Sequence, residues 1–491
     1  MTRLKPVIEG RGVASIARNL TYLLGGRGVY FVTRFIYVVI LARILGPQIY
    51  GMISYGIAWY LLFIPLTSMG LAVVLSRDVG EDRERGKRTA ALTLTLRVVS
   101  ILVATVAYFI LSVWIEDDPS SRLLIFVFSF ALMGRSLALW TENVYTAYEV
   151  NRYSFWQQSI FRSLEVVLGL VVLMVWREAL PVVIIHGLVW CLQAVYGLTM
   201  IHRQEFPLRL NRNIPDLYRI FLQGLPLAGS TFLMAVVYQG PLIFFRHLVP
   251  DGNALGQMAL AMQVLFVLAQ IPSALGSVSL PVLSRAAARQ DGKDRIFAET
   301  ALRFSLFFGT ALALLGTVLG PWVIAQIFGK NYVQAGALVG PVMWLLVPST
   351  AGHALVMILM ARKLDFQALF CALFGAVLFS LTISELVLKF GAFGAICSAG
   401  IGMMMTMTGF ILVLRNRLAM DLRASLIKPG LTALAAAGVY HALHAFGPGL
   451  SLPGAFLVLA LGGYLFKCLT PQDMIWFQHS LGSFANKKHS D

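Results

Sequence analysis

Charged residues are scarce in this sequence. Asp, Glu, Lys and Arg make up 13% of its 491 residues, about half the share that soluble domains carry. Hydrophobic residues make up 58%, and they recur in nearly uncharged stretches from one end of the chain to the other. So large an apolar excess is typical of a protein that spans a membrane, and it excludes an ordinary soluble domain.

Signatures of catalysis and of metal binding are also lacking. The sequence has no GxxxxGK(S/T) phosphate loop, no HExxH pair and no GxSxG elbow. The segments between apolar stretches, such as 115–121, are too short to form a catalytic domain. We therefore expect no enzyme, no cofactor and no metal. The four cysteines lack metal-ligand spacing and are expected to be free, buried thiols: Cys191, Cys371, Cys397 and Cys468.

Fourteen apolar runs are long enough to cross the roughly 30 Å hydrocarbon layer of a bilayer as helices. Backbone polar groups in lipid have to bond within their own segment, so continuous runs of this kind form helices. We expect an all-α polytopic membrane protein of about fourteen transmembrane helices. These cover residues 20–43, 49–75, 90–114, 122–150, 155–176, 179–201, 218–248, 254–284, 300–328, 334–361, 366–388, 391–414, 424–446 and 452–469.

The basic residues test this arrangement, because positively charged loops stay on the cytoplasmic side of a membrane. With a cytoplasmic N-terminus, most of the 39 Lys and Arg fall in inner loops, and only Arg177, Lys330 and Lys389 fall in outer ones. The net charge of +16 therefore records membrane topology and gives no reason to expect a nucleic-acid partner. The sequence predicts a multi-pass protein, surrounded by membrane lipids, with both termini in the cytoplasm.

A sequence repeat relates the first six expected helices to the next six. Each copy has an Arg at a helix end, then a Pro, a Gly opening the next helix, a mid-helix Pro and a Leu-Ser-Arg exit. The matched residues are Arg43, Pro47, Gly51, Pro65 and Arg77 in one copy and Arg246, Pro250, Gly256, Pro272 and Arg285 in the other. Six helices per copy predict parallel repeats related by an axis along the membrane normal. We expect an N-lobe (1–201), a cytoplasmic linker (202–217), a C-lobe (218–414), and a C-terminal helix pair with a tail (415–491).

Three segments carry a family resemblance: ARILGPQIYG at 42–51, GLAVVLSRDVG at 70–80 and IFGKNYVQAG at 327–336. With the helix count and the two lobes, they make the chain similar to the polysaccharide-transporter (Wzx-like oligosaccharide flippase) branch of the multidrug/oligosaccharidyl-lipid/polysaccharide (MOP) exporter superfamily. The resemblance implies a two-lobed transporter of the bacterial inner membrane. Such a protein flips undecaprenyl-diphosphate-linked oligosaccharides from the cytoplasmic to the periplasmic leaflet by alternating access. It also implies a cationic cavity between the lobes that receives the headgroup.

One stripe of the first expected helix carries Arg27, Tyr30, Arg34 and Tyr37, spaced three and four residues apart. A charge in mid-bilayer costs at least roughly 2.5–3.5 kcal/mol, so such a stripe faces a cavity or a partner rather than lipid. We expect a cavity wall whose guanidinium groups bind diphosphate oxygens, which arginine suits better than lysine. The alternative is that these arginines pair with carboxylates of other helices. Arg43 is expected to anchor the helix end.

The fourth expected helix carries a second polar face. Arg135, Glu142 and Glu149 recur on it every seven residues, with Tyr145 between the two carboxylates. We expect Arg135 to be a cavity cation and Tyr145 a cavity aromatic residue. The two glutamates are candidates for gating or for carrying a coupling proton, Glu142 more so than Glu149. The alternative is a ladder of structural ion pairs that binds this helix to the first.

Two further arginines, Arg97 and Arg303, lie about two turns into a helix from the cytoplasmic side. They either extend their charges to the membrane surface or line an inward-facing vestibule that attracts an anionic headgroup. Arg162 and Glu165, three residues apart, are expected to satisfy one another as a structural pair.

The balance of charge within the helices separates the candidate functions. Nine arginines lie within or at the ends of the expected helices, against four glutamates, and this surplus suits an anionic lipid-linked glycan. We expect a flippase for a polyprenyl-diphosphate-linked oligosaccharide that serves O-antigen, capsule or exopolysaccharide biosynthesis. An H⁺ or Na⁺ gradient or the membrane potential would drive it, and polysaccharide polymerase machinery is a candidate partner. The alternatives are a cation-coupled drug or metabolite exporter, a peptidoglycan-precursor flippase of the same superfamily, and a non-transporting membrane scaffold or enzyme.

Overall fold

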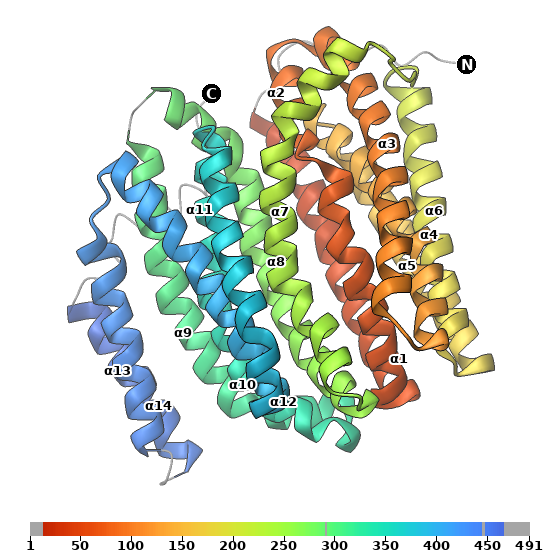
Figure 1. The fold of residues 1–491 in the computed structure, drawn as a ribbon. Helices are drawn as coiled ribbons and strands as arrows, with labels where there is room; N and C mark the ends of the chain where they lie inside the picture. The colour runs from red at the N-terminus through yellow and green to blue at the C-terminus, as the bar shows by residue number, and fades with distance from the viewer. Residues whose placement is uncertain (1–12, 290–291, 444–446, 466–491) are drawn as a thin grey trace.

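The computed structural model describes residues 13–289, 292–443 and 447–465, and every regular element in these ranges is helical. Figure 1 shows two bundles side by side, with a further pair of helices along the outer side of the second. The N-lobe consists of α1 (Val13–Ser68), α2 (Leu71–Glu81), α3 (Arg83–Ile115), α4 (Pro119–Ala147), α5 (Asn151–Trp176) and α6 (Ala179–Gln204). The C-lobe consists of α7 (Ile214–Leu248), α8 (Gly252–Arg289), α9 (Lys293–Phe328), the 3-10 turn η1 (Lys330–Tyr332), α10 (Val333–Trp344), α11 (Leu346–Ala361) and α12 (Asp365–Leu418). The π-helical turn η2 (Arg423–Ile427) leads into the outer pair, α13 (Lys428–Leu443) and α14 (Pro448–Leu465).

Nine described helices are long and apolar enough to cross a membrane, and α10 with α11, bent by 41°, makes a tenth candidate span. Two of the nine, α1 and α12, are each two helices joined at a non-helical residue, Gly46 (φ 72°) and Gly391 (φ 59°). A positive φ strains any residue with a Cβ, which explains glycine at both turns. Together with the shorter helices α13 and α14, the described helices confirm the predicted all-α, fourteen-helix fold.

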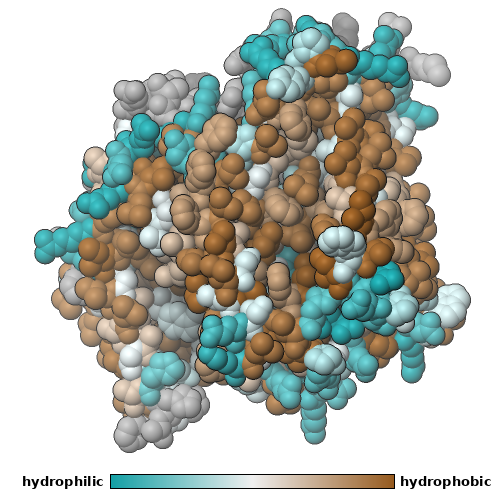
Figure 2. Space-filling view, viewed as in Figure 1, coloured by the Kyte–Doolittle hydropathy of each residue, from teal (hydrophilic) through white to brown (hydrophobic). Residues whose placement is uncertain are grey.

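The surface fits a membrane setting. Figure 2 shows a broad apolar band with hydrophilic residues gathered toward its upper and lower margins. Large apolar side chains are exposed on α3, α5 and α12, among them Trp114 (84%), Met174 (71%) and Leu381 (71%). So much exposed apolar surface is unfavourable in water and favourable against acyl chains.

The two lobes meet closely at one end of the molecule, which we call the Gly46 end; the opposite end, which carries α2, we call the α2 end (Figure 1). At the Gly46 end the repeat-equivalent glycines pack against one another's backbone. A Cβ on Gly51 would lie 2.7 Å from the backbone nitrogen of Gly256, and a Cβ on Gly256 would overlap the carbonyl group of Pro47. A contact between equivalent residues is what an axis relating the two lobes produces.

Two arginines of the repeat cross between the lobes at this end. Arg43 donates from Nε and Nη2 to the carbonyl oxygens of Ile327 (2.5 Å) and Gln326 (2.6 Å), in the last turn of α9. Its equivalent, Arg246, lies 4.0 Å from the carboxylate of Asp118, just beyond the end of α3. Each arginine therefore reaches the end of the third span of the opposite lobe. We call these the crossed arginine contacts. The sequence predicts that Arg43 anchors the end of its own helix, and it instead binds the end of α9 in the other lobe.

Asp118 is held in its charged form at this contact. The hydroxyl (2.7 Å) and the backbone N–H (2.9 Å) of Ser121 donate to its carboxylate. These hydrogen bonds, the hydroxyl first, lower the pKa of Asp118 below its ordinary value, and Arg246 adds to the effect. The carboxylate therefore stays ionised opposite Arg246 at neutral pH.

Some of the residues discussed in the sequence analysis lie outside the part of the chain that the structure describes. This applies to the tail beyond residue 465, which includes Cys468, and to the side chains of Arg77, Pro272 and Arg285. The other three cysteines are free thiols, and of these Cys371 is buried. The lobe boundaries at residues 201, 217 and 414 we keep as a proposal.

Candidate binding cavity

A cavity of about 410 Å³ lies between the two lobes. Its walls come from α1, α4, α5 and α6 on the N-lobe side and from α7, α8 and α11 on the C-lobe side. The lining reaches Leu41 and Tyr50, close to the Gly46 turn, where the packed lobes bound it. A volume of this size is typical of small-molecule binding sites.

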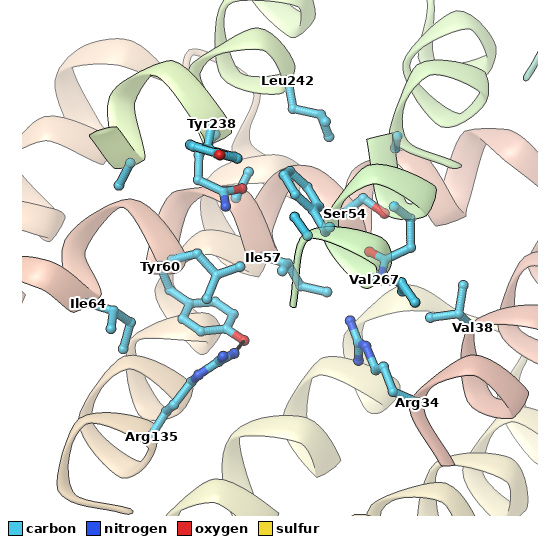
Figure 3. Close-up of a pocket in the computed structure, with 18 of the residues that line it drawn as sticks. Arg34, Val38, Ser54, Ile57, Tyr60, Ile64, Arg135, Tyr238, Leu242 and Val267 are labelled. Carbon is cyan, nitrogen blue, oxygen red and sulfur yellow. Dashed lines mark hydrogen bonds between the residues drawn. The ribbon is translucent and has the colours of Figure 1, made fainter. Parts of the chain in front are cut away.

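Among the described residues, three arginines and no carboxylate line the cavity: Arg34, Arg135 and Arg162. Figure 3 shows Arg34 and Arg135 entering it from α1 and α4. Arg34 is 18% exposed; its one charged contact is 4.0 Å long, to Glu165, and it makes no hydrogen bond with a described residue. The donors of Arg34 are therefore available to a ligand.

An aromatic surface holds the other two guanidinium groups without neutralising them. The guanidinium carbon of Arg162 lies 3.7 Å from the centre of the Trp190 ring, and that of Arg135 lies 4.9 Å from it. Arg135 also donates to the hydroxyl of Tyr60 at 3.0 Å, the dashed line in Figure 3. Cation–π contacts fix the position of a charge while leaving it positive.

Glu165 lies behind this wall and connects its parts. It accepts from Arg162, with which it forms the predicted ion pair, and from Nδ1 of His186 at 2.6 Å. His186 in turn contacts the Tyr60 hydroxyl at 3.1 Å. A buried network of hydrogen bonds and ion pairs holds its side chains in one geometry. The pair is therefore structural, as expected, but Arg162 also lines the cavity.

The structure places three of the four stripe residues of α1, Tyr30, Arg34 and Tyr37, on the cavity wall. Arg27, one turn earlier, does not line it and interacts electrostatically with Glu142. Substrate binding by Arg27 and its pairing with a carboxylate both stay predictions.

The polar face of α4 is divided in the same way. Arg135 lines the cavity, whereas Glu142 lies outside the lining and accepts from Gln158 (2.5 Å) and Gln193 (3.3 Å). Glu149 lies on the exposed turn between α4 and α5. Tyr145 is fully buried away from the cavity because its hydroxyl donates to the carbonyl of Gly197 on α6, at 3.0 Å.

Arg97 and Arg303 are buried and do not line the cavity in this structure. Arg97 donates to the hydroxyl of Ser68 at 2.9 Å, beside the break that separates α1 from α2. Arg303 donates to Thr300 on the same helix, at 3.1 Å. These hydroxyl groups bind one nitrogen of each guanidinium group, and a vestibule role for the two arginines stays a prediction.

The family model for polysaccharide biosynthesis proteins matches residues 16–287, more than half of the chain. The chain belongs to the polysaccharide biosynthesis protein family. The match covers all but the first three residues of the described N-lobe, together with α7 and most of α8, and therefore most of the cavity wall. No curated protein sequence matches this family member.

Solved structures establish its fold. It is similar to the lipid II flippase MurJ in an inward closed conformation, with a TM-score of 0.66, 13% identity, and coverage of 93% of this chain and 100% of that one. It is also similar to an inward-facing multidrug resistance MATE transporter of the MOP superfamily, with a TM-score of 0.61 and 14% identity. That match covers 82% of this chain and 98% of the transporter. A third match is a MOP superfamily transporter from Pyrococcus furiosus, with a TM-score of 0.58 and 13% identity. It covers 83% of this chain and 95% of that one. The polysaccharide biosynthesis protein thus has the MOP transporter fold that the sequence resemblance predicts.

Sequence reasoning missed Trp190, Tyr60 and the C-lobe wall. His186 and Trp190 are four residues apart on α6, so they share a face, and this spacing was the one available signal. On the C-lobe side the polar lining is uncharged and has no motif spacing; it consists of Thr231, Tyr238, Gln239, Gln263 and His353.

Replacing Glu165 with glutamine should strongly destabilise this polysaccharide biosynthesis protein. Glu165 is 4% exposed, and its loss leaves Arg162 buried without a carboxylate. Breaking a buried pair in this way typically costs about 3–5 kcal/mol. Thermal unfolding of the purified protein in detergent measures the effect. As a control, Glu385→Gln removes a fully exposed pair with Lys389 on α12 and should change the midpoint little. Equal midpoints for the two variants would show that the network does not hold the wall.

Proposed function

We propose that this protein translocates a polyprenyl-diphosphate-linked oligosaccharide from the cytoplasmic to the periplasmic leaflet of the bacterial inner membrane. It would do so by alternating access and serve O-antigen, capsule or exopolysaccharide biosynthesis. One observation carries the proposal: the cavity between the lobes is lined by three arginines and, among the described residues, by no carboxylate. A diphosphate is a multiply charged anion with several acceptor oxygens, and guanidinium groups bind such anions through paired hydrogen bonds.

The electrostatics behind the wall support an anionic ligand. Glu142 and Glu165 lie close to the wall arginines, but Glu165 is already bonded to Arg162 and His186. Two carboxylates cannot neutralise the three wall arginines, Arg34, Arg135 and Arg162, so the wall keeps a surplus of positive charge. In a low-dielectric setting an anionic headgroup removes this surplus favourably.

The arrangement of the lobes supports a mechanism of alternating access. With a cytoplasmic N-terminus the Gly46 end faces the periplasm, and the crossed arginine contacts close the cavity on that side. The headgroup would enter from the cytoplasm and bind Arg34 and Arg135. Separation of the lobes at the Gly46 end would then release it. An H⁺ or Na⁺ gradient would drive the cycle, and Glu142, held by Gln158 and Gln193 next to the wall, is our candidate proton carrier.

The charge of the cavity lining argues against the main alternative, a cation-coupled drug or metabolite exporter. An exporter of cationic drugs would more naturally have acidic groups in its cavity, and this lining offers none among the described residues. For the Pyrococcus furiosus transporter, reverse polarity of the binding pocket is stated to suggest a different function. The second candidate is a peptidoglycan-precursor flippase, favoured by the fold likeness to the lipid II flippase MurJ. Essentiality of the gene for growth would favour that candidate.

A deletion strain tests the proposal. Restoring the wild-type protein should restore surface polysaccharide and leave growth inhibition by a panel of cationic drugs unchanged. Polysaccharide is measured by gel analysis of cell-surface glycan, and drug sensitivity by minimal inhibitory concentrations. Restored drug resistance without any change in glycan would refute the flippase and favour the exporter.

A further inference from the structure

The two walls of the cavity differ in chemistry. The N-lobe wall carries all three arginines, whereas the C-lobe wall, formed by α7, α8 and α11, carries no charged residue among its described lining residues. Figure 3 shows Tyr238 on the α7 side of the cavity and Arg34 and Arg135 on the other side. A ligand that spans the cavity therefore meets guanidinium groups at one wall and neutral groups at the other.

Two amide side chains face the cavity without a partner. Gln239 on α7 and Gln263 on α8 line it, and neither makes a hydrogen bond with a described residue. Each amide offers two donor hydrogens and one acceptor oxygen. Polar groups kept from protein partners in a largely apolar cavity are costly unless water or a ligand bonds to them. The donors and acceptors of both amides are therefore available to a ligand in the cavity.

The neighbouring polar groups of the C-lobe wall are fixed in place. Tyr238 donates to the hydroxyl of Ser349 at 2.6 Å, and Nδ1 of His353 lies 2.7 Å from the backbone carbonyl of Ser349. A carbonyl oxygen only accepts, so the His353 proton lies on Nδ1 and the imidazole Nε2 is left as an acceptor. The wall therefore presents neutral donors and acceptors in a fixed setting.

Sugar hydroxyl groups both donate and accept, and neutral amides match them in both roles. Phosphate oxygens only accept, so the amide oxygens and the His353 acceptor suit them poorly. The distribution of groups thus separates a phosphate side from a sugar side. The flanking apolar residues of the same wall, such as Phe266 and Met357, suit the CH faces of a sugar ring.

We propose that the C-lobe wall is a sugar subsite in which Gln239 and Gln263 bind the sugar attached to the diphosphate, while Arg34 and Arg135 bind the diphosphate itself. This rests on the proposed function. The headgroup then lies across the cavity with one part on each lobe. The C-lobe amides select which glycan is transported, and the N-lobe arginines select for the anionic carrier common to all of them.

Binding to the purified protein in detergent separates the two walls. The probes are undecaprenyl diphosphate alone and undecaprenyl diphosphate carrying one sugar, either N-acetylglucosamine or galactose. In the wild type at least one sugar-bearing probe should bind more tightly than the bare diphosphate. Gln239→Leu with Gln263→Leu should reduce this advantage about tenfold or more, as expected for two lost hydrogen bonds, and leave affinity for the bare diphosphate unchanged.

Controls make each outcome decisive. Unchanged binding of the bare diphosphate shows that the double variant is folded, and Gln334→Leu, at an exposed position on α10 outside the lining, should behave as wild type. If the double variant keeps the full sugar advantage, or weakens all probes equally, the sugar subsite is wrong while the proposed function stands. If the wild type binds both sugar-bearing probes no better than the bare diphosphate, the subsite is likewise wrong. If it binds no probe, the proposed function fails as well.

Discussion

Arg34→Ala combined with Arg135→Ala should abolish glycan export while leaving the protein inserted in the membrane. Arg34 has no hydrogen bond to a described residue and Arg135 keeps donors beyond its bond to Tyr60, so both can bind a diphosphate. Hydrogen bonds to charged groups contribute about 1.5–3 kcal/mol each, so each lost arginine should reduce headgroup affinity roughly 10- to 100-fold. Surface polysaccharide in a complemented deletion strain measures export, and immunoblotting of membranes measures insertion.

Two further variants serve as comparisons in this experiment. Arg34→Lys keeps the charge but loses the planar pair of donors, so it should retain export at an intermediate level. Arg152→Ala removes an exposed arginine at the start of α5, outside the lining, and should export as wild type does. Full export by the double alanine variant would mean that the wall arginines do not bind the substrate.

Removing the crossed arginine contacts with Arg43→Ala and Arg246→Ala should open the Gly46 end. Arg43 holds two carbonyl groups of α9, and Arg246 faces Asp118 beyond α3, so both variants loosen the same closure. Because Arg43 is exposed, solvent weakens its contribution, and we expect a shift of about tenfold in the population of the open state.

A buried cysteine reports this opening. Ile53 is 3% exposed near the packed end, and Ile53→Cys in a cysteine-free background should react slowly with a membrane-impermeant thiol reagent. The double arginine variant should react about ten times faster. Tyr55, which donates to Glu116 of its own lobe (2.7 Å), also contacts His247 of α7 in the other lobe (3.0 Å), so closure is weakened rather than lost. Unchanged reactivity would show that the arginines do not hold this end.

Hydropathy and helical periodicity predicted the spans and the stripe of α1 well, because both depend on local order along the chain. The spacing of Tyr30, Arg34 and Tyr37 places them on one face, and that face meets the cavity. Periodicity does not reveal how deep in the membrane a residue lies, how far its helix tilts, or which helix packs beside it. Arg27 lies on the same stripe, yet it lies beyond the cavity and interacts with Glu142.

The remaining site residues depend on packing between helices that are distant in sequence. Arg162 becomes part of the wall because Trp190 of α6 packs against its guanidinium group. Tyr145 is withdrawn because Gly197 of α6 offers it a carbonyl group. Gln239 and Gln263 carry no charge, and nothing in their spacing distinguishes them from other polar residues of membrane helices.

A structure of the protein bound to undecaprenyl diphosphate tests most directly whether the cavity arginines form the substrate site. We predict phosphate density within hydrogen-bonding distance of the Arg34 and Arg135 guanidinium groups, with the polyprenyl chain leaving between the lobes. Density for the phosphates elsewhere, with both arginines turned away from the ligand, would contradict the account.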